Sequence, residues 1–425
     1  MTDRSALWGQ SSVGRALAAA GAGVLAASAL LSAAAIAGTG PASVPAAVHV
    51  PLTPSTLPAT GRMIQRFTAA NMIGSFAGTQ SDAVDLAKAY DVISATAGQF
   101  GRYLPAMRAA NPKLIILVYL NGTLAQKSQS SAYPASWYLY SSSGNKVVSR
   151  YGNLLMDPTN QGWIDNRTQT CAQLITGGYD GCFVDMLGIA PLLPGYLTAL
   201  PVDPTTGATY TSTAWVAATA KVGGAVAAAV TPKFVVGNGV SSGTRYFDQT
   251  APTSQLLDPI SGGSGEAWLK APTASAAYYP TAKRWQQNID ALVDAGSHGR
   301  SIFAITKTWG AGTADQINAW HLFALASFLL GNDGHSYFAF TRANTQAGIV
   351  YDDPWEHANV GQPTGAYTRN ADGSYQRLFT TGEAIVNPTS TSVTVTPAHA
   401  MCDLGGVSHN SVILGPEGAQ VLTDC

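Results

Sequence analysis

The sequence predicts a (β/α)8 TIM barrel, an α/β fold, followed by a small C-terminal antiparallel β domain. Eight short apolar segments alternate with helical segments over about 280 residues, which is the order and spacing of such a barrel. No glycine-rich phosphate loop follows the first segment, which disfavours the alternative of a doubly wound open sheet. Beyond Tyr351 the pattern changes to short alternating segments separated by turn residues.

The predicted strands are apolar runs bounded by turn residues. The clearest is Lys113–Leu120 (KLIILVYL), which Asn121-Gly122 closes. The strand Cys182–Met186 follows an Asp-Gly step that turns the chain. The remaining predicted strands are Arg62–Phe67, Tyr90–Ala95, Lys233–Val240, Gly262–Leu269, Ser301–Trp309 and His335–Thr341.

Capping and stop signals mark the helices between these strands. A Ser/Asp start caps Ser81–Ala89, and Asn111-Pro112 ends Phe100–Ala110. Gly177-Gly178 ends Trp163–Thr176, because glycine accepts the left-handed geometry of a helix C-terminus. The other predicted helices are Thr213–Val230, a short one near Gly243–Phe247, Thr281–Ala295 and Ala314–Leu330.

Two regions depart from the barrel repeat. Thr123–Pro158 is rich in aromatic, serine and glycine residues, which suits a loop domain over a site. The C-terminal strands are Gln376–Phe379, Gly382–Asn387, Ser392–Thr396 and Val412–Leu414. We therefore assign residues 61–345 to the barrel and 346–425 to a β-sandwich-like domain.

The N-terminus resembles an export signal. Arg4 and Arg15 flank the start of an apolar run that ends in the cleavage pattern Ala35-Ile36-Ala37. Residues 1–37 are thus a predicted signal peptide, and residues 38–60, rich in Pro, Ala, Ser and Thr, a disordered linker. The alternative is an uncleaved membrane anchor, and in both cases the folded part lies outside the cytoplasm.

Composition limits the class of partner. Only 11% of the 425 residues are charged and the formal net charge is −1, which disfavours nucleic acid or an anionic membrane as partner. The seven histidines show no metal-binding spacing, so we expect no metal and no cofactor. We expect a secreted monomer that takes a polysaccharide or oligosaccharide.

Four cysteines agree with export. They allow three pairings, of which we expect Cys171–Cys182 and Cys402–Cys425, since each would join one local region. Free buried thiols are the alternative.

Asp185 and Glu266 are the candidate catalytic residues. Asp185 ends the predicted fourth strand and Glu266 lies within the sixth, and in a barrel both strands open toward the face where active sites lie. A charge is costly to bury, so an acid at such a position needs a reason. Glycosidic bond cleavage uses a pair of carboxylates, one to attack or orient water and one to protonate the leaving oxygen. The alternatives are a bracing aspartate at 185 and a salt-bridged glutamate at 266.

Other residues are candidates for binding a sugar. Asp157 would orient substrate or cap the next helix, and Asn238 would bind a sugar hydroxyl or form a turn. The remaining candidates lie near strand ends. Three are aromatic residues whose faces could stack on pyranose rings, namely Tyr119, Trp268 and Trp309. The fourth, Lys307, would pair with the acids or bind substrate oxygens. Each aromatic residue has a core position as its alternative.

The segments NPKLIILVYLNG, DPTNQGWIDNRTQTCAQLITGGYDGCFVDMLG, GEAW and GEAIVNPT resemble the TIM-barrel glycoside hydrolase-like proteins. More distantly the chain is similar to the α-galactosidase and polygalactosaminidase groups, whose G-x-DG-hydrophobic-x-D segment carries an acid on strand four. The resemblance covers about Arg62 to Pro397 and implies Asp185 as nucleophile and Glu266 as general acid/base. Met186-Leu187 replaces the Asn or Asp often found there, which leaves the substrate open.

These observations predict a secreted glycoside hydrolase that cleaves O-glycosidic bonds of a polysaccharide with two carboxylates. The alternative is a non-catalytic carbohydrate-binding or cell-surface protein on a degenerate barrel.

Overall fold

The structure is a computed structural model that describes residues 54–425, which form one compact unit. The predicted signal peptide and the first part of the predicted linker, residues 38–53, lie outside the described residues.

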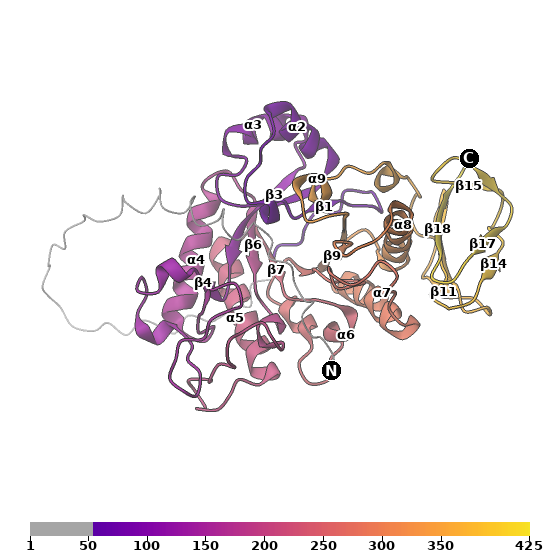
Figure 1. Ribbon diagram of the computed structural model, residues 1–425. Helices are drawn as coiled ribbons and strands as arrows, with labels where there is room; N and C mark the ends of the chain where they lie inside the picture. The colour runs from indigo at the N-terminus through magenta and orange to yellow at the C-terminus, as the bar shows by residue number, and fades with distance from the viewer. Residues whose placement is uncertain (1–53) are drawn as a thin grey trace, which may run out of the picture. The chain divides into compact units, whose positions relative to one another are not determined.

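The described chain is built on a parallel sheet of eight strands in the order β1-β2-β3-β6-β7-β8-β9-β10 (Figure 1). Each strand pairs in parallel with the next, which confirms the predicted barrel. The strands are Phe67–Thr68 (β1), Val92–Ala95 (β2), Ile115–Asn121 (β3), Gly181–Asp185 (β6), Phe234–Asn238 (β7), Gly262–Gly265 (β8), Ser301–Lys307 (β9) and Tyr337–Thr341 (β10).

The seam between β1 and β10 closes the barrel with little backbone pairing. The two strands meet at one parallel bridge, Arg66 to Phe338, and β1 is only two residues long where Arg62–Phe67 was predicted. Side-chain contacts add to the sparse backbone pairing here: the buried guanidinium of Arg66 pairs with Glu356, with 2.9 Å between Nε and Oε2. The Arg66 backbone N–H also donates to the carboxylate of Asp91 at 2.7 Å.

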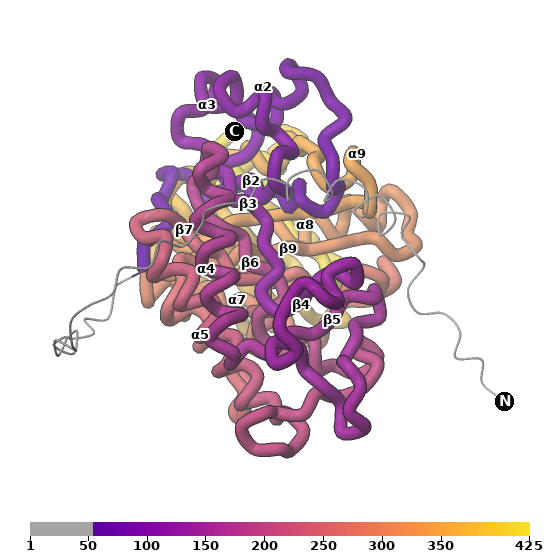
Figure 2. Tube along the Cα trace, turned by 90° about the vertical axis from the view of Figure 1, so that its left-hand side faces the viewer, coloured from indigo at the N-terminus to yellow at the C-terminus, as the bar shows by residue number. Residues whose placement is uncertain are grey.

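The helices cover the outer face of the sheet at the places that the sequence predicts. Figure 2 shows α4 and α5 side by side over the strands β3, β6 and β7, with which they are in contact. By length and composition α5 would span a membrane, but its Trp215, Val222 and Val226 are fully buried. The helices are Gln80–Ala89 (α2), Leu104–Ala110 (α3), Gln161–Ile175 (α4), Ser212–Val230 (α5), Gly243–Tyr246 (α6), Ala282–Ser297 (α7), Ala314–Gly331 (α8) and Gln346–Ile349 (α9).

The predicted sixth strand is shorter than expected. β8 ends at Gly265, so Glu266 follows the strand rather than lying within it. Ala267 and Trp268, the apolar residues that suggested a longer strand, lie in the turn that follows β8. Trp268 is 2% exposed, donates its indole N–H to the carbonyl of Asn288 at 3.2 Å and contacts Phe328 of α8 edge to face.

The end of the predicted linker belongs to the folded unit. Leu57 is 2% exposed and packs among the residues that fill the barrel interior. The carbonyl of Pro58 accepts a hydrogen bond from the hydroxyl of Tyr337 at 3.2 Å. Residues Leu57 and Pro58, before the predicted barrel start at 61, therefore pack on the barrel, and burial of the Leu57 side chain is the main contact.

The C-terminal domain is an antiparallel β structure. It has a six-stranded sheet, β11-β12-β13-β18-β15-β16, and a two-stranded sheet, β14-β17. Figure 1 shows β18 beside α8, and β13 and β18 both contact that helix. Its strands are Thr368–Arg369 (β11), Tyr375–Leu378 (β12), Gly382–Val386 (β13), Val393–Val395 (β14), Met401–Asp403 (β15), Ser408–His409 (β16), Val412–Leu414 (β17) and Ala419–Thr423 (β18).

The chain after the predicted boundary at residue 345 also contacts the barrel. Residues after it still pack on the barrel: the carbonyl of Ile349 accepts from the hydroxyl of Thr68 at 3.0 Å, and Glu356 pairs with Arg66. Two acids of this connecting stretch contact α8: the buried His321 has Nε2 3.0 Å from Glu356 Oε1 and Nδ1 3.3 Å from Asp353 Oδ2.

Candidate active site

Polar side chains replace apolar ones at the carboxyl ends of the barrel strands. Side chains two residues apart on a strand share a face, so a residue two positions after an interior residue also faces the interior. Four strands show this step from an apolar to a polar side chain: Leu117 to Tyr119, Phe183 to Asp185, Val236 to Asn238 and Ile305 to Lys307. The strand pattern thus places these polar groups around the mouth of the barrel.

Asp185 lies at the centre of a hydrogen-bond cluster. Its Oδ2 accepts from the hydroxyl of Tyr119 at 2.7 Å. Its Oδ1 accepts from Nδ2 of Asn238 at 2.7 Å and from the backbone N–H of Met186 at 2.8 Å. Both oxygens accept hydrogen bonds, an arrangement that suits an ionised carboxylate held in one orientation.

Opposing effects act on the acidity of Asp185. Burial raises its pKa, and the negative charge of Glu266 raises it further. The hydrogen bonds from Tyr119, Asn238 and Met186 lower it, and the net result is a pKa above the ordinary value of 3.8. The two candidate acids are therefore close enough for the charge of one to act on the other.

Glu266 sits in a different environment. Its side chain is 39% exposed, and its Oε2 lies 3.3 Å from Nζ of Lys307, which is itself 2% exposed. That ammonium also lies 4.7 Å from the centre of the Trp309 ring, whose indole N–H donates to Thr341 at 2.9 Å. The pair of acids is therefore asymmetric: one is buried and hydrogen bonded, and the other is accessible beside a cation.

The backbone is strained directly after Asp185. Met186 has φ 62°, in the left-handed region that non-glycine residues rarely occupy. Such a residue costs on the order of 1–3 kcal/mol and persists where its surroundings hold it. Its carbonyl accepts from the hydroxyl of Thr123 at 2.9 Å, and the next N–H, of Leu187, donates to the Asn238 carbonyl at 2.9 Å.

A disulfide fixes the strand that carries Asp185. Cys182 of β6 is bonded to Cys171 of α4, and both side chains are fully buried. The second disulfide joins Cys402 of β15 to Cys425. Both pairings are those expected from the sequence, and the first links the fourth strand to the helix before it.

Four predicted site residues have structural contacts of their own. The carboxylate of Asp157 accepts from the backbone N–H and the hydroxyl of Thr159, at 2.9 and 2.7 Å, just before α4. The N-cap of α4 is Asn160, whose side chain accepts from the Trp163 N–H, so Asp157 holds the turn before the helix and does not cap it. Trp268 lies in the core, and Tyr119 and Asn238 hydrogen bond to Asp185 rather than standing free.

Sequence reasoning missed Tyr196. Its hydroxyl lies 3.3 Å from the sulfur of Met186, next to Asp185, although the residue belongs to the loop after β6. No strand or motif surrounds it in the sequence, so the only available signal was an aromatic residue in a long loop.

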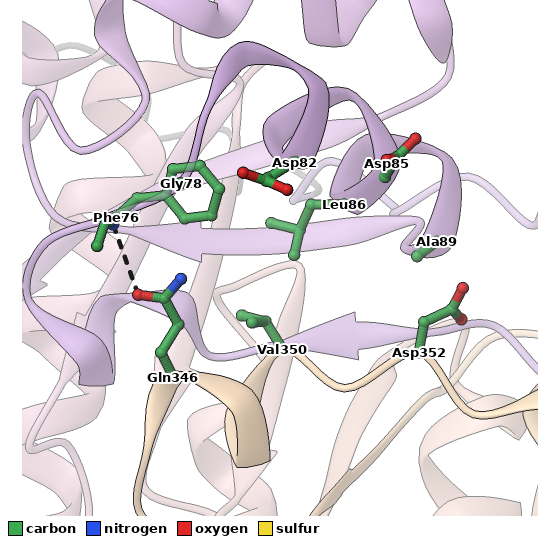
Figure 3. A pocket seen from close by; sticks show the side chains of 10 residues that line it. Phe76, Gly78, Asp82, Asp85, Leu86, Ala89, Gln346, Val350 and Asp352 are labelled. Atoms are coloured by element: carbon green, nitrogen blue, oxygen red, sulfur yellow. Dashed lines mark hydrogen bonds between the residues drawn. The ribbon is translucent and has the colours of Figure 1, made fainter.

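Two pockets lie away from the acid pair. One, of about 390 Å³, lies between α2 and α9, and Figure 3 shows Leu86 and Val350 on its apolar side with Asp82 and Asp352 nearby. Both carboxylates already have partners, Thr79 and His357. The other, of about 610 Å³, lies between Trp355 and the Cys402–Cys425 disulfide. Among the described residues no group of three or more potential metal ligands occurs.

Two unlike carboxylates at the carboxyl ends of barrel strands are an arrangement that hydrolases with acid/base chemistry use. A model of the hypothetical glycosyl hydrolase family 15 matches residues 108–383. The chain therefore belongs to that family, and is a glycoside hydrolase.

Comparison with solved structures agrees with the fold. The GH31 dextranase FjDex31A of Flavobacterium johnsoniae aligns at a TM-score of 0.50 and 10% identity, over 88% of this chain and 52% of its own. A noncanonic maltogenic α-amylase of Thermotoga neapolitana aligns at 0.49 and 12% identity, over 85% and 98%. The glycoside hydrolase domain of PelA from Pseudomonas aeruginosa aligns at 0.45 and 14%, over 68% and 99%. The search of curated proteins finds no match.

Proposed function

We propose that this glycoside hydrolase cleaves a polysaccharide outside the cytoplasm, with Asp185 as nucleophile and Glu266 as general acid/base. The observation that carries the proposal is the asymmetric acid pair. Three donors hold the Asp185 carboxylate, and Glu266 is accessible to a leaving group. Paired carboxylates in unlike environments are how such sites divide acid and base roles.

The proposed reaction has two steps. Glu266, as the carboxylic acid, protonates the leaving glycosidic oxygen while Asp185 attacks the anomeric carbon and forms a glycosyl ester. Glu266, now a carboxylate, then takes a proton from water, which displaces Asp185. Nζ of Lys307 lies 3.3 Å from Oε2 of Glu266, so the acid/base residue has a cationic neighbour in both steps.

The two disulfides support the proposed location, because disulfides persist in oxidising compartments. The polysaccharide class is suggested by the GH31 dextranase whose structure aligns with this chain.

The activity is tested with the full chain on a panel of bacterial and fungal cell-wall polysaccharides, α-glucans and galactosaminoglycans, with release of reducing sugar as readout. Asp185→Asn should abolish release but spare binding of the polysaccharide that the wild type cleaves. Equal release by wild type and Asp185→Asn would refute the role of Asp185.

Azide separates the two carboxylate roles. In a Glu266→Ala variant, azide should restore turnover of an activated aryl glycoside and give a glycosyl azide of retained anomeric configuration. In an Asp185→Ala variant the azide product should be inverted. The opposite pattern would exchange the two roles.

A further inference from the structure

Two long loops join over the mouth of the barrel. The loop after β3 and the loop after β6 meet at an antiparallel bridge between Ser149 and Leu197. The backbone N–H of Thr198 donates to the Val148 carbonyl at 2.8 Å, and that of Arg150 donates to the Tyr196 carbonyl at 2.7 Å. Tyr196 is therefore fixed by backbone pairing rather than carried on a free loop.

Tyr196 reaches the acid pair from this junction. Its hydroxyl lies 3.3 Å from the sulfur of Met186, the residue that follows Asp185. Thioether sulfur is a weak acceptor, so this contact leaves most of the hydroxyl's hydrogen-bonding capacity unused. Burial, then the negative charge of Asp185, raises the pKa of Tyr196, and Glu266 adds to this. The hydroxyl thus stays protonated, beside the residue that follows Asp185.

Two further side chains extend this surface outward. Tyr151, 63% exposed, meets the Tyr196 ring edge to face with 5.9 Å between the ring centres. The guanidinium carbon of Arg150 lies 4.9 Å from the centre of the Tyr151 ring and 5.2 Å from that of Tyr196. We call Arg150, Tyr151 and Tyr196 the tyrosine platform.

We propose that the tyrosine platform binds the sugar unit next to the scissile bond, with the Tyr196 hydroxyl hydrogen bonding to a sugar hydroxyl and the Tyr151 ring against the sugar's C–H face. The proposal rests on the proposed function, since that function places the scissile bond between Asp185 and Glu266. An exposed aromatic ring beside an underused hydroxyl presents what a pyranose requires, an apolar face and a polar edge.

The platform is tested by sugar binding independently of cleavage. Saturation-transfer NMR would measure binding to the wild-type protein of a matched series, glucose, glucosamine and glucuronate, and of the corresponding galactose series. We expect at least one of the six sugars to bind, and its binding to depend on the Tyr196 hydroxyl. No binding by any of the six would overturn the proposal.

The matched variants are Tyr196→Phe and Tyr140→Phe. Both remove one hydroxyl from the same pair of joined loops, but the hydroxyl of Tyr140 donates to the Ala135 carbonyl at 3.1 Å and not toward the acids. Tyr196→Phe keeps the ring packing, so we expect about 10-fold weaker sugar binding and a similar loss in kcat/KM, mainly through KM. Tyr140→Phe should stay within about twofold of wild type.

Failure of the inference and of the proposed function are distinguishable. Equal effects of the two substitutions would overturn the platform while cleavage continues. Loss of sugar binding in Tyr196→Phe, in a protein that cleaves none of the tested polysaccharides, would support the platform and count against the proposed hydrolysis.

Discussion

Replacing Tyr119 by phenylalanine isolates the hydrogen bond that reaches Oδ2 of Asp185. The substitution removes a hydroxyl 2.7 Å from the carboxylate and leaves the ring in the barrel. A hydrogen bond to a charged group contributes about 1.5–3 kcal/mol. At about 1.4 kcal/mol for each factor of ten, kcat/KM near neutral pH should fall by about 10- to 150-fold.

The pH profile gives the sharper readout. Because the Tyr119 hydrogen bond lowers the pKa of Asp185, its loss raises that pKa further. The nucleophile must be ionised, so the acidic limb of kcat/KM should move to higher pH, measured from about pH 3 to 9 on the best substrate. Tyr138→Phe is the control, because it removes a hydrogen bond of the same length, 2.7 Å to the Gln129 carbonyl, within the loop after β3. A limb that stays where it is in Tyr119→Phe would refute the reasoning.

Three further predictions concern stability. The pKa of Asp185 is raised in the folded protein, so its ionised form destabilises the fold, and this cost appears as the pH rises from 3.8 through the raised pKa. Asp185→Asn should therefore increase the Tm at pH 7 while abolishing activity. A lower Tm would contradict this. In the double variant Cys171→Ala/Cys182→Ala, the free energy of unfolding measured with denaturant should fall by about 3 kcal/mol, from the loop-entropy relation for a separation of 11 residues. This variant should also lose more activity than Cys402→Ala/Cys425→Ala. Equal activity losses would count against a role of the first disulfide in holding β6. Burial alone would lower the pKa of His321, but the hydrogen bonds that its ring donates to the carboxylates of Asp353 and Glu356 raise that pKa above 6.5. The stabilising charge of His321 is therefore present below pH 6.5 and is lost as the pH rises through the raised pKa. Thermal melts from pH 5 to 9 should show this decline in the wild type and a flatter profile in His321→Gln; parallel profiles would disprove it.

The strands could be predicted from sequence because their signal is local. Ile115–Asn121 and Ser301–Lys307 are apolar runs bounded by turn residues, and a buried parallel strand requires little else. The strand predicted at β8 is too long, because Ala267 and Trp268 continue the apolar pattern beyond Gly265. The chain turns after Gly265, and the indole instead packs on α8, a choice that only tertiary contacts decide.

The candidate acids could be found from sequence, but not the groups that hold them. Asp185 stands out as a charge at the end of a buried strand. Tyr119 and Asn238 were predicted to touch substrate, whereas the barrel places their side chains on Asp185. That contact depends on which strands are neighbours, and β3, β6 and β7 are separated in the chain by long loops. Tyr196 was missed for the same reason, since a bridge between two loops brings it to the site.

The seam at β1 makes the barrel unequal around its circumference. β9 and β10 share five registered residue pairs, whereas β10 and β1 share one bridge and the hydrogen bond from Phe338 N to the Gln65 carbonyl. Local opening should therefore start there, because few backbone bonds must break to part the two strands. Amide hydrogen exchange should be faster at Phe338 than at Ile305, deep in β9. The ion pair of buried Arg66 with Glu356 holds the seam closed. Removing the charge of either side chain should therefore speed amide exchange at the seam, although the backbone pairing of the sheet is unchanged.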